Sequence, residues 1–176
     1  MKKLSIIILL IFAVSKSFAQ MPDFSKEAAE AMTKLSVMNG KWEGKGWSMM
    51  PNGEKHSSNV FENMQWKLDN TVLQIEGVGK TDEGQVVHNA LGIIYYDPMQ
   101  KKYKMHSHLS SGLSTQASFE VIEPNRKFEW LFEDGRGGTV KYVITIDAAN
   151  WKEEGEYSRP GMPASKFFEM NLKKVN

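Results

Sequence analysis

The chain has 176 residues, with 22 lysines and arginines against 21 aspartates and glutamates, and it contains no cysteine. This nearly balanced charge argues against a surface that binds nucleic acid or anionic membranes. The lack of thiols excludes thiolate zinc sites, iron–sulfur clusters, cysteine nucleophiles and a cysteine-linked lipid anchor.

Residues 1–19 have the pattern of a signal peptide. Lys2 and Lys3 precede an apolar run over residues 4–14, and Ser17-Phe18-Ala19 has the small-x-small form of a cleavage site. A permanent anchor helix is the alternative, but the apolar run falls short of the roughly 20 residues that span a bilayer. Cleavage after Ala19 would remove three lysines and take the net charge from +1 to −2. We therefore expect a periplasmic or secreted protein with no stable membrane anchor.

Residues 20–40 are predicted to form a helical segment that closes one end of the domain. Within 21–38, apolar residues recur at helical spacing, as in Phe24, Ala28, Met32 and Leu35. Asp23 or Ser25 can cap the start of this helix, and Asn39-Gly40 ends it.

Residues 41–176 are predicted to form one β-domain, because the apolar period changes to two. For example, Val60, Glu62, Met64 and Trp66 alternate with Phe61, Asn63, Gln65 and Lys67. Turn residues separate about ten expected strands, near 41–49, 57–68, 71–79, 86–96, 102–109, 114–121, 127–133, 138–147, 151–158 and 165–173.

An all-β, antiparallel up-and-down barrel is the fold that this pattern favours. No helical stretch between the strands is long enough for a parallel crossover. Closure into a barrel removes the two sheet edges that an open arrangement would expose. A two-sheet β-sandwich is the alternative.

Two short stretches carry a resemblance to known proteins. Gly40-Lys41-Trp42 resembles the Gly-x-Trp signature at the first strand of lipocalin-like (calycin) barrels, where the tryptophan packs beneath a short N-terminal helix. The run 91–98 (LGIIYYDP), followed by Lys102-Tyr103, resembles a hairpin of an uncharacterised bacterial family of such barrels, a domain of unknown function.

More distantly, the layout resembles the nitrobindins and the fatty-acid-binding-protein-like barrels. The nitrobindins bind heme through a histidine on a late strand. This chain departs from that pattern, because its last histidine is His108 and its final strand offers Phe167, Phe168 and Met170 instead. We therefore expect no heme and no other cofactor.

Three histidines are the candidates for metal or acid–base chemistry. His106 and His108 face the same way on a strand, and zinc or copper could bind there if His88 supplied a third ligand. If Tyr95 pairs with Tyr103 in the hairpin, the three histidines share one face of the sheet. If Tyr96 pairs with Tyr103 instead, His88 lies on the opposite face from His106 and His108. Because Lys104 lies in the row of His106, we favour a solvated polar face and predict no metal site.

The expected ligand-binding residues are mostly aromatic. An apolar interior with a few polar groups suits a small apolar or amphipathic ligand, although the same residues could simply form the core. The set comprises Trp66, Met105, Trp130, Phe132, Tyr142 and Phe168, with His106 and His108 as polar members.

The sequence favours an exported binding protein, with two alternatives. One is an envelope protein-interaction module with a filled core, and the other is a cavity enzyme that uses His106 or His108 as a general base. Glu153, Glu154 and Glu156 are interpreted as a solvated strand, with Glu153 facing opposite to the other two. No catalytic residue is assigned, and the oligomeric state stays open.

Overall fold

The computed structural model describes residues 22–50 and 52–175. The predicted signal peptide, residues 1–19, lies outside the described residues, so its cleavage stays a prediction. The helical and barrel segments that follow are described almost completely.

Ten strands form a single antiparallel sheet, as the alternation predicts. Their bounds agree with the expected ranges to within a few residues. They are β1 Gly40–Met49, β2 Lys55–Lys67, β3 Val72–Lys80, β4 Val86–Asp97, β5 Lys102–Leu109, β6 Ser114–Glu123, β7 Lys127–Glu133, β8 Thr139–Asp147, β9 Asn150–Arg159 and β10 Met162–Val175.

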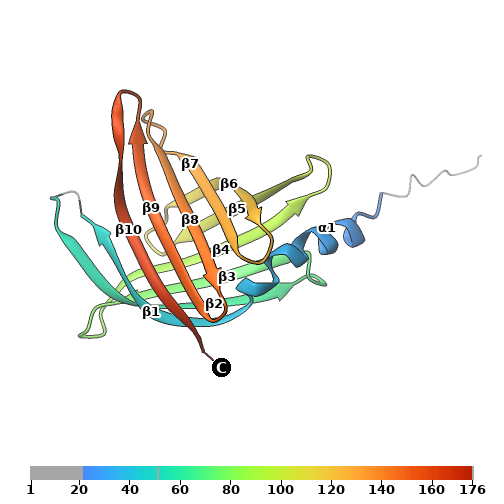
Figure 1. The fold of residues 1–176 in the computed structure, drawn as a ribbon, viewed down its shortest axis with the longest axis horizontal. Helices are drawn as coiled ribbons and strands as arrows, with labels where there is room; N and C mark the ends of the chain where they lie inside the picture. The colour runs from blue at the N-terminus through green and yellow to red at the C-terminus, as the bar shows by residue number, and fades with distance from the viewer. Residues whose placement is uncertain (1–21, 51, 176) are drawn as a thin grey trace, which may run out of the picture.

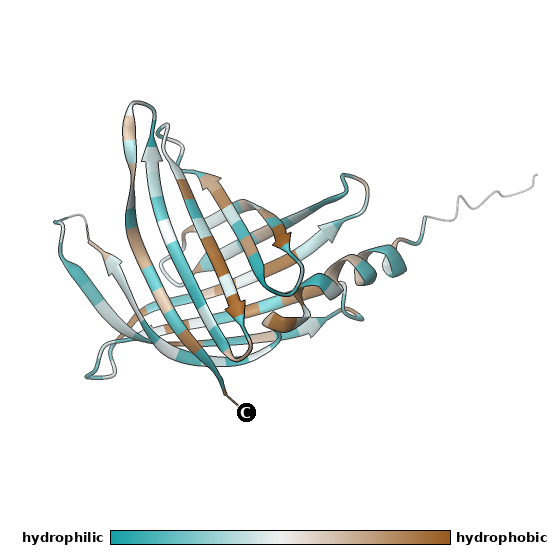
Figure 2. Ribbon diagram, viewed as in Figure 1, coloured by the Kyte–Doolittle hydropathy of each residue, from teal (hydrophilic) through white to brown (hydrophobic). Residues whose placement is uncertain are grey.

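The sheet closes on itself. Each strand pairs with its neighbours in sequence, and β1 also pairs with β10 from Lys41↔Val175 to Ser48↔Phe168. The fold is therefore an up-and-down barrel, as predicted, and the sandwich alternative is excluded (Figure 1). Hydrophobic and hydrophilic residues alternate along the strands because one face of the closed sheet turns inward (Figure 2).

A short helix precedes the barrel and leads into one of its ends (Figure 1). It consists of α1, Ser25–Met32, and a 3₁₀ continuation η1, Thr33–Met38, so it begins four residues later than the predicted 21–38. Asp23 Oδ1 accepts a hydrogen bond from the Ser25 amide at 2.9 Å, which stabilises the start of the helix.

Hydrogen bonds hold this helical segment against the barrel. The Tyr103 hydroxyl donates to the Ala31 carbonyl at 2.7 Å, and the Asn125 amide donates to the Lys34 carbonyl at 2.8 Å. The Asn125 side chain in turn accepts hydrogen bonds from Ser36 Oγ and the Val37 amide. The helix thus closes the end of the barrel at which β6 turns into β7.

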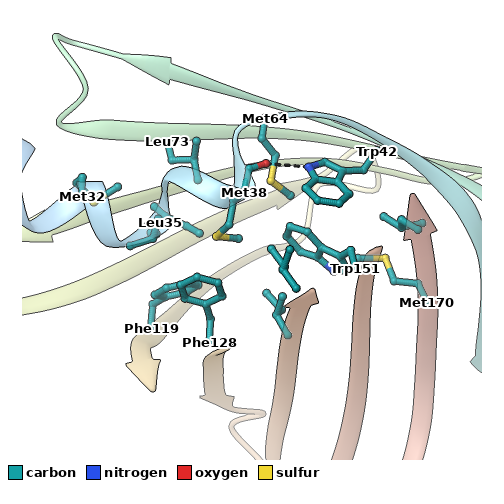
Figure 3. Packing of buried hydrophobic residues seen from close by; sticks show 14 residues of the cluster. Met32, Leu35, Met38, Trp42, Met64, Leu73, Phe119, Phe128, Trp151 and Met170 are labelled. Atoms are coloured by element: carbon teal, nitrogen blue, oxygen red, sulfur yellow. Dashed lines mark hydrogen bonds between the residues drawn. The ribbon is translucent and has the colours of Figure 1, made fainter. Parts of the chain in front are cut away.

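The filled core lies at this closed end. Met32, Leu35 and Met38 of the helical segment are fully buried against the barrel floor. The Trp42 indole donates to the Met38 carbonyl at 2.8 Å and meets Trp151 edge-on, with ring centroids 5.4 Å apart (Figure 3). Trp42 therefore packs beneath the helix, as the Gly-x-Trp resemblance implies.

The turn between the last two strands is tight. β9 ends at Arg159 and β10 begins at Met162, so only Pro160 and Gly161 form the turn. Gly161 has a φ of +80°, which a glycine adopts without strain.

Among the described residues, no helix has the length and apolar character needed to cross a membrane.

Candidate ligand-binding cavity

Above the filled floor the barrel is hollow. The cavity has a volume of about 840 Å³ and is lined by the inward rows of the strands. Its lining reaches Met50, Thr81 and Gln85 in the hairpin regions remote from the helix, so the cavity opens at the end of the barrel opposite α1. A volume of this size is within the range of small-molecule sites.

One wall of the cavity is aromatic. Trp130 and Tyr142 are cross-strand partners whose rings stack with centroids 3.9 Å apart and an interplanar angle of 6°. Phe132 continues the wall, with its ring 6.0 Å from that of Trp130. Flat, apolar side chains arranged in this way offer a broad surface to an apolar or aromatic molecule.

A β-bulge adds two more rings to this wall. On β10 the register shifts between Lys166, which pairs with Glu156, and Phe168, which pairs with Gly155, so Phe167 is an extra residue. Phe167 and Phe168 therefore both meet the Tyr142 ring edge-on, each with its centroid 5.5 Å away. A strictly alternating strand would turn only one of them inward.

Glu153 is a buried carboxylate in the lining of the cavity. Its side chain is only 6% exposed. Oε1 accepts a hydrogen bond from the Trp130 indole at 3.0 Å, and Oε2 accepts one from the Trp151 indole at 3.3 Å. Burial raises the pKa of Glu153 to about 7, although the two indole hydrogen bonds act in the opposite direction.

Glu62 is a second buried carboxylate in the same lining. It is 9% exposed, and no described residue donates a hydrogen bond to it. Gly77, its partner on β3, leaves room for the carboxylate. Burial, together with repulsion from Glu153, raises the pKa of Glu62 to about 8.

The rest of the lining supplies no strong counter-charge. Among the described residues that line the cavity there is no lysine or arginine. The basic groups are His56 on β2 and His88 on β4, towards the open end of their strands. The floor of the cavity is therefore acidic, while most of its wall is apolar.

The structure brings five of the eight predicted ligand-binding residues together. They line the cavity, and they are Met105, Trp130, Phe132, Tyr142 and Phe168. Trp66 also faces inward but packs against the filled core at the closed end. His106 and His108 lie on the outer face of β5, outside the cavity.

The hairpin register separates the histidines. Tyr96 pairs with Tyr103, which is the second of the two registers that the sequence allowed. His88 therefore faces the cavity, whereas His106 and His108 face outward with Lys104. No group of three potential metal ligands is found among residues 22–50 and 52–175.

The sequence interpretation missed both buried carboxylates. Glu153 does face opposite to Glu154 and Glu156, as predicted, but it lies inside the barrel and not on a solvated strand. The signal was present in the alternation: Glu62 lies in the row of Val60 and Met64, and Glu153 lies two residues from Trp151. A carboxylate in an apolar row is costly to bury and so marks a functional candidate.

Comparison with solved structures supports the fold. The barrel is similar to Rv2717c from M. tuberculosis, with a TM-score of 0.60 and 13% sequence identity over 85% of this chain and 98% of that one. It is also similar to the S-type phycobiliprotein lyase CPES from Guillardia theta, with a TM-score of 0.55 and 11% identity over 88% and 99% of the two chains.

Comparison of the sequence adds no family. No family model and no curated protein matches the chain. Identities this low show a shared fold and nothing finer. Together with the closed ten-stranded topology, they show that the chain shares its barrel fold with these two proteins.

Proposed function

We propose that this chain is an exported binding protein that holds a small apolar or amphipathic molecule inside its barrel. The observation that carries the proposal is the cavity of about 840 Å³, open at one end and walled by aromatic and aliphatic side chains. The pattern of residues 1–19 supports export to the periplasm or secretion. The hairpin motif in 91–98 supports membership of the uncharacterised bacterial family that it resembles.

The two alternatives have less support. An interaction module with a filled core needs no cavity, and the core of this barrel is filled only at the closed end. An enzyme that used His106 or His108 as a base would need one of them inside the cavity, and both lie outside it.

Native mass spectrometry of the protein purified from its own host tests the proposal. A retained ligand would appear as added mass that disappears on denaturation. A substitution that fills the cavity, Ala90→Trp, should abolish that mass, because Ala90 lines the cavity on β4. The neighbouring substitution Leu91→Trp should leave it in place, because Leu91 lies on the outer face and is 40% exposed.

Two results would overturn the proposal. Added mass that survives in Ala90→Trp would place the bound molecule outside the barrel. Protein from the host that carries no small molecule, and that melts at the same temperature with and without an extract of host lipids and metabolites, would leave the cavity without a binding role.

A further inference from the structure

Glu62 and Glu153 limit what the cavity can bind. Each carboxylate is more than nine-tenths buried, and both line the same cavity. Glu153 is held in place by two indoles, whereas the carboxylate of Glu62 has no hydrogen-bond donor among the described residues. A buried carboxylate without a partner costs free energy unless something else supplies a donor or a positive charge.

The remainder of the lining does not supply that charge. No described lining residue is a lysine or an arginine, and His56 and His88 lie towards the mouth. The surface lysines that form ion pairs, such as Lys152 and Lys166 with Glu154, lie on the outer face of the barrel. A cation that pairs with the ionised Glu62 would therefore have to enter through the open end.

We propose that the ligand of this barrel is an apolar or aromatic amine, whose ammonium group binds at the floor between Glu62 and Glu153. An ammonium carries three hydrogen-bond donors and no acceptor, which matches two carboxylates in their ionised, acceptor-only form. Its apolar body would lie along the wall formed by Phe132, Trp130 and Tyr142. This inference rests on the proposed binding function and names the chemical class of the ligand.

The same geometry disfavours an anionic ligand. A carboxylate head group at the floor would face two acceptors and no lysine or arginine, so one partner would have to be protonated. Among the described residues that line the cavity, only His56 and His88, towards the mouth, could attract it. A cationic amine and an anionic carboxylate should therefore differ in affinity, because the floor of the cavity favours a positive charge.

Three probes that share one apolar chain test the assignment: decylamine, 1-decanol and decanoate. Each is titrated below its micelle concentration against the full mature protein, with the intrinsic tryptophan fluorescence as the signal. The titration is run at about pH 9, where a primary alkylamine is still protonated. Both carboxyls are ionised there, since burial raises the pKa of Glu153 only to about 7 and that of Glu62 to about 8.

Tyr142 and His88, which share the cavity, carry no competing positive charge at that pH. Burial and the neighbouring Glu153 raise the pKa of the Tyr142 phenol, so it stays neutral. Burial lowers the pKa of His88, so its imidazole is neutral at about pH 9.

We expect decylamine to bind at least about tenfold more tightly than either of the other probes. Glu62→Gln should remove most of that preference. It keeps the size of the side chain and breaks no hydrogen bond between described residues. Glu156→Gln is the matched control, since Glu156 is exposed on the outer face of β9, and it should bind like the wild type.

A measurement on the wild type keeps the proposal falsifiable if a variant fails to fold. At about pH 7, Glu62 holds a proton, and an ammonium that binds beside it should release that proton. Calorimetry in two buffers with different ionisation enthalpies should therefore show proton release for decylamine. Glu153→Gln is a poorer variant, because its amide would face an indole donor on one side.

Two outcomes would overturn the amine assignment and leave the binding function standing. One is decanoate or decanol binding as tightly as decylamine, and the other is an amine preference that survives Glu62→Gln. If none of the three probes binds, the cavity does not accept an apolar chain, and the binding function fails together with this inference.

Discussion

The carboxylate of Glu62 lies directly over Gly77 on the neighbouring strand. A Cβ atom added to Gly77 would come within 2.7 Å of Oε1 and 2.8 Å of Oε2. The missing side chain of Gly77 is what gives the buried carboxylate its place in the barrel wall. Gly155 has a comparable relation to the aromatic wall, where an added Cβ would meet the Tyr142 ring at 2.8 Å and Phe168 Cβ at 2.9 Å.

The two glycines should therefore respond differently to substitution by alanine. Gly155→Ala presses on packed rings and on the start of a side chain, and it should destabilise the protein by about 1–3 kcal/mol. Gly77→Ala presses on the end of a flexible side chain that can turn into the cavity, so its effect on stability should be clearly smaller. Chemical denaturation of both variants checks the order.

Gly77→Ala has a second expected effect. The displaced Glu62 carboxylate should hold an ammonium less well, so the preference of the barrel for decylamine over decanol should fall. Equal destabilisation by the two substitutions would contradict this account of how the glycines shape the cavity.

Periodicity predicted the barrel well because an alternating sequence has one way to bury its apolar face in an antiparallel sheet. Hairpin register, however, depends on the geometry of the turn. The choice between Tyr95 and Tyr96 as the partner of Tyr103 could not be made from residue types, and it decides where His88 points.

The site was harder to predict than the fold. The bulge at Phe167 has no glycine or proline to announce it, yet it sets how the last strand faces the cavity. Glu62 and Glu153 could have been found from their apolar rows. The electrostatic repulsion between them could not, because it acts between β2 and β9 across the interior.

Stability should fall with rising pH because of the two buried carboxyls. Their folded pKa values, about 8 for Glu62 and about 7 for Glu153, lie above the ordinary value of 4.5. The folded state thus holds protons that the unfolded state releases. The contribution is fully present below about pH 4.5 and is lost as the pH rises through the folded pKa values.

Glu62→Gln should weaken this dependence, because a glutamine does not ionise and does not repel Glu153. Its melting temperature should exceed that of the wild type at about pH 9 and match it at about pH 5. Glu156→Gln, on the outer face, should follow the wild type at both values. Parallel pH profiles for Glu62→Gln and the wild type would show that Glu62 is not buried in solution.

Export should leave a defined N-terminus. N-terminal sequencing of the protein from the periplasm or the culture medium should begin at Gln20, the residue after the small-x-small pattern. Ala19→Arg should block cleavage and accumulate the longer form, while Phe18→Ala should be cleaved normally because the middle position is unrestricted. An exported protein that still begins at Met1 would contradict the signal peptide.

Zinc should not stabilise the protein through its histidines. His88 lies on the opposite face of the sheet from His106 and His108, so the three imidazoles cannot share one ion. At about pH 8, Zn²⁺ should shift the melting temperature of the wild type and of His106→Ala equally. A stoichiometric shift that His106→Ala abolishes would require a different hairpin register.

The two tryptophans of β1 give the last test, which concerns the closed end. Trp42 is fully buried, and its indole bonds the Met38 carbonyl beneath the helical segment. Trp47 is half-buried on the opposite face of the strand, with Lys55 Nζ 3.8 Å from its ring centroid.

Trp42→Ala should cost about 3–5 kcal/mol, the usual range for a buried aromatic residue, because it leaves a cavity beside Trp151 and an unpaired carbonyl at the end of η1. Trp47→Ala should cost clearly less, since water can fill the space that its ring leaves. Denaturant unfolding of both variants, with ΔG of unfolding as the readout, measures the difference. Equal costs would mean that η1 does not close the barrel through Trp42, and the floor on which the proposed amine site rests would need another anchor.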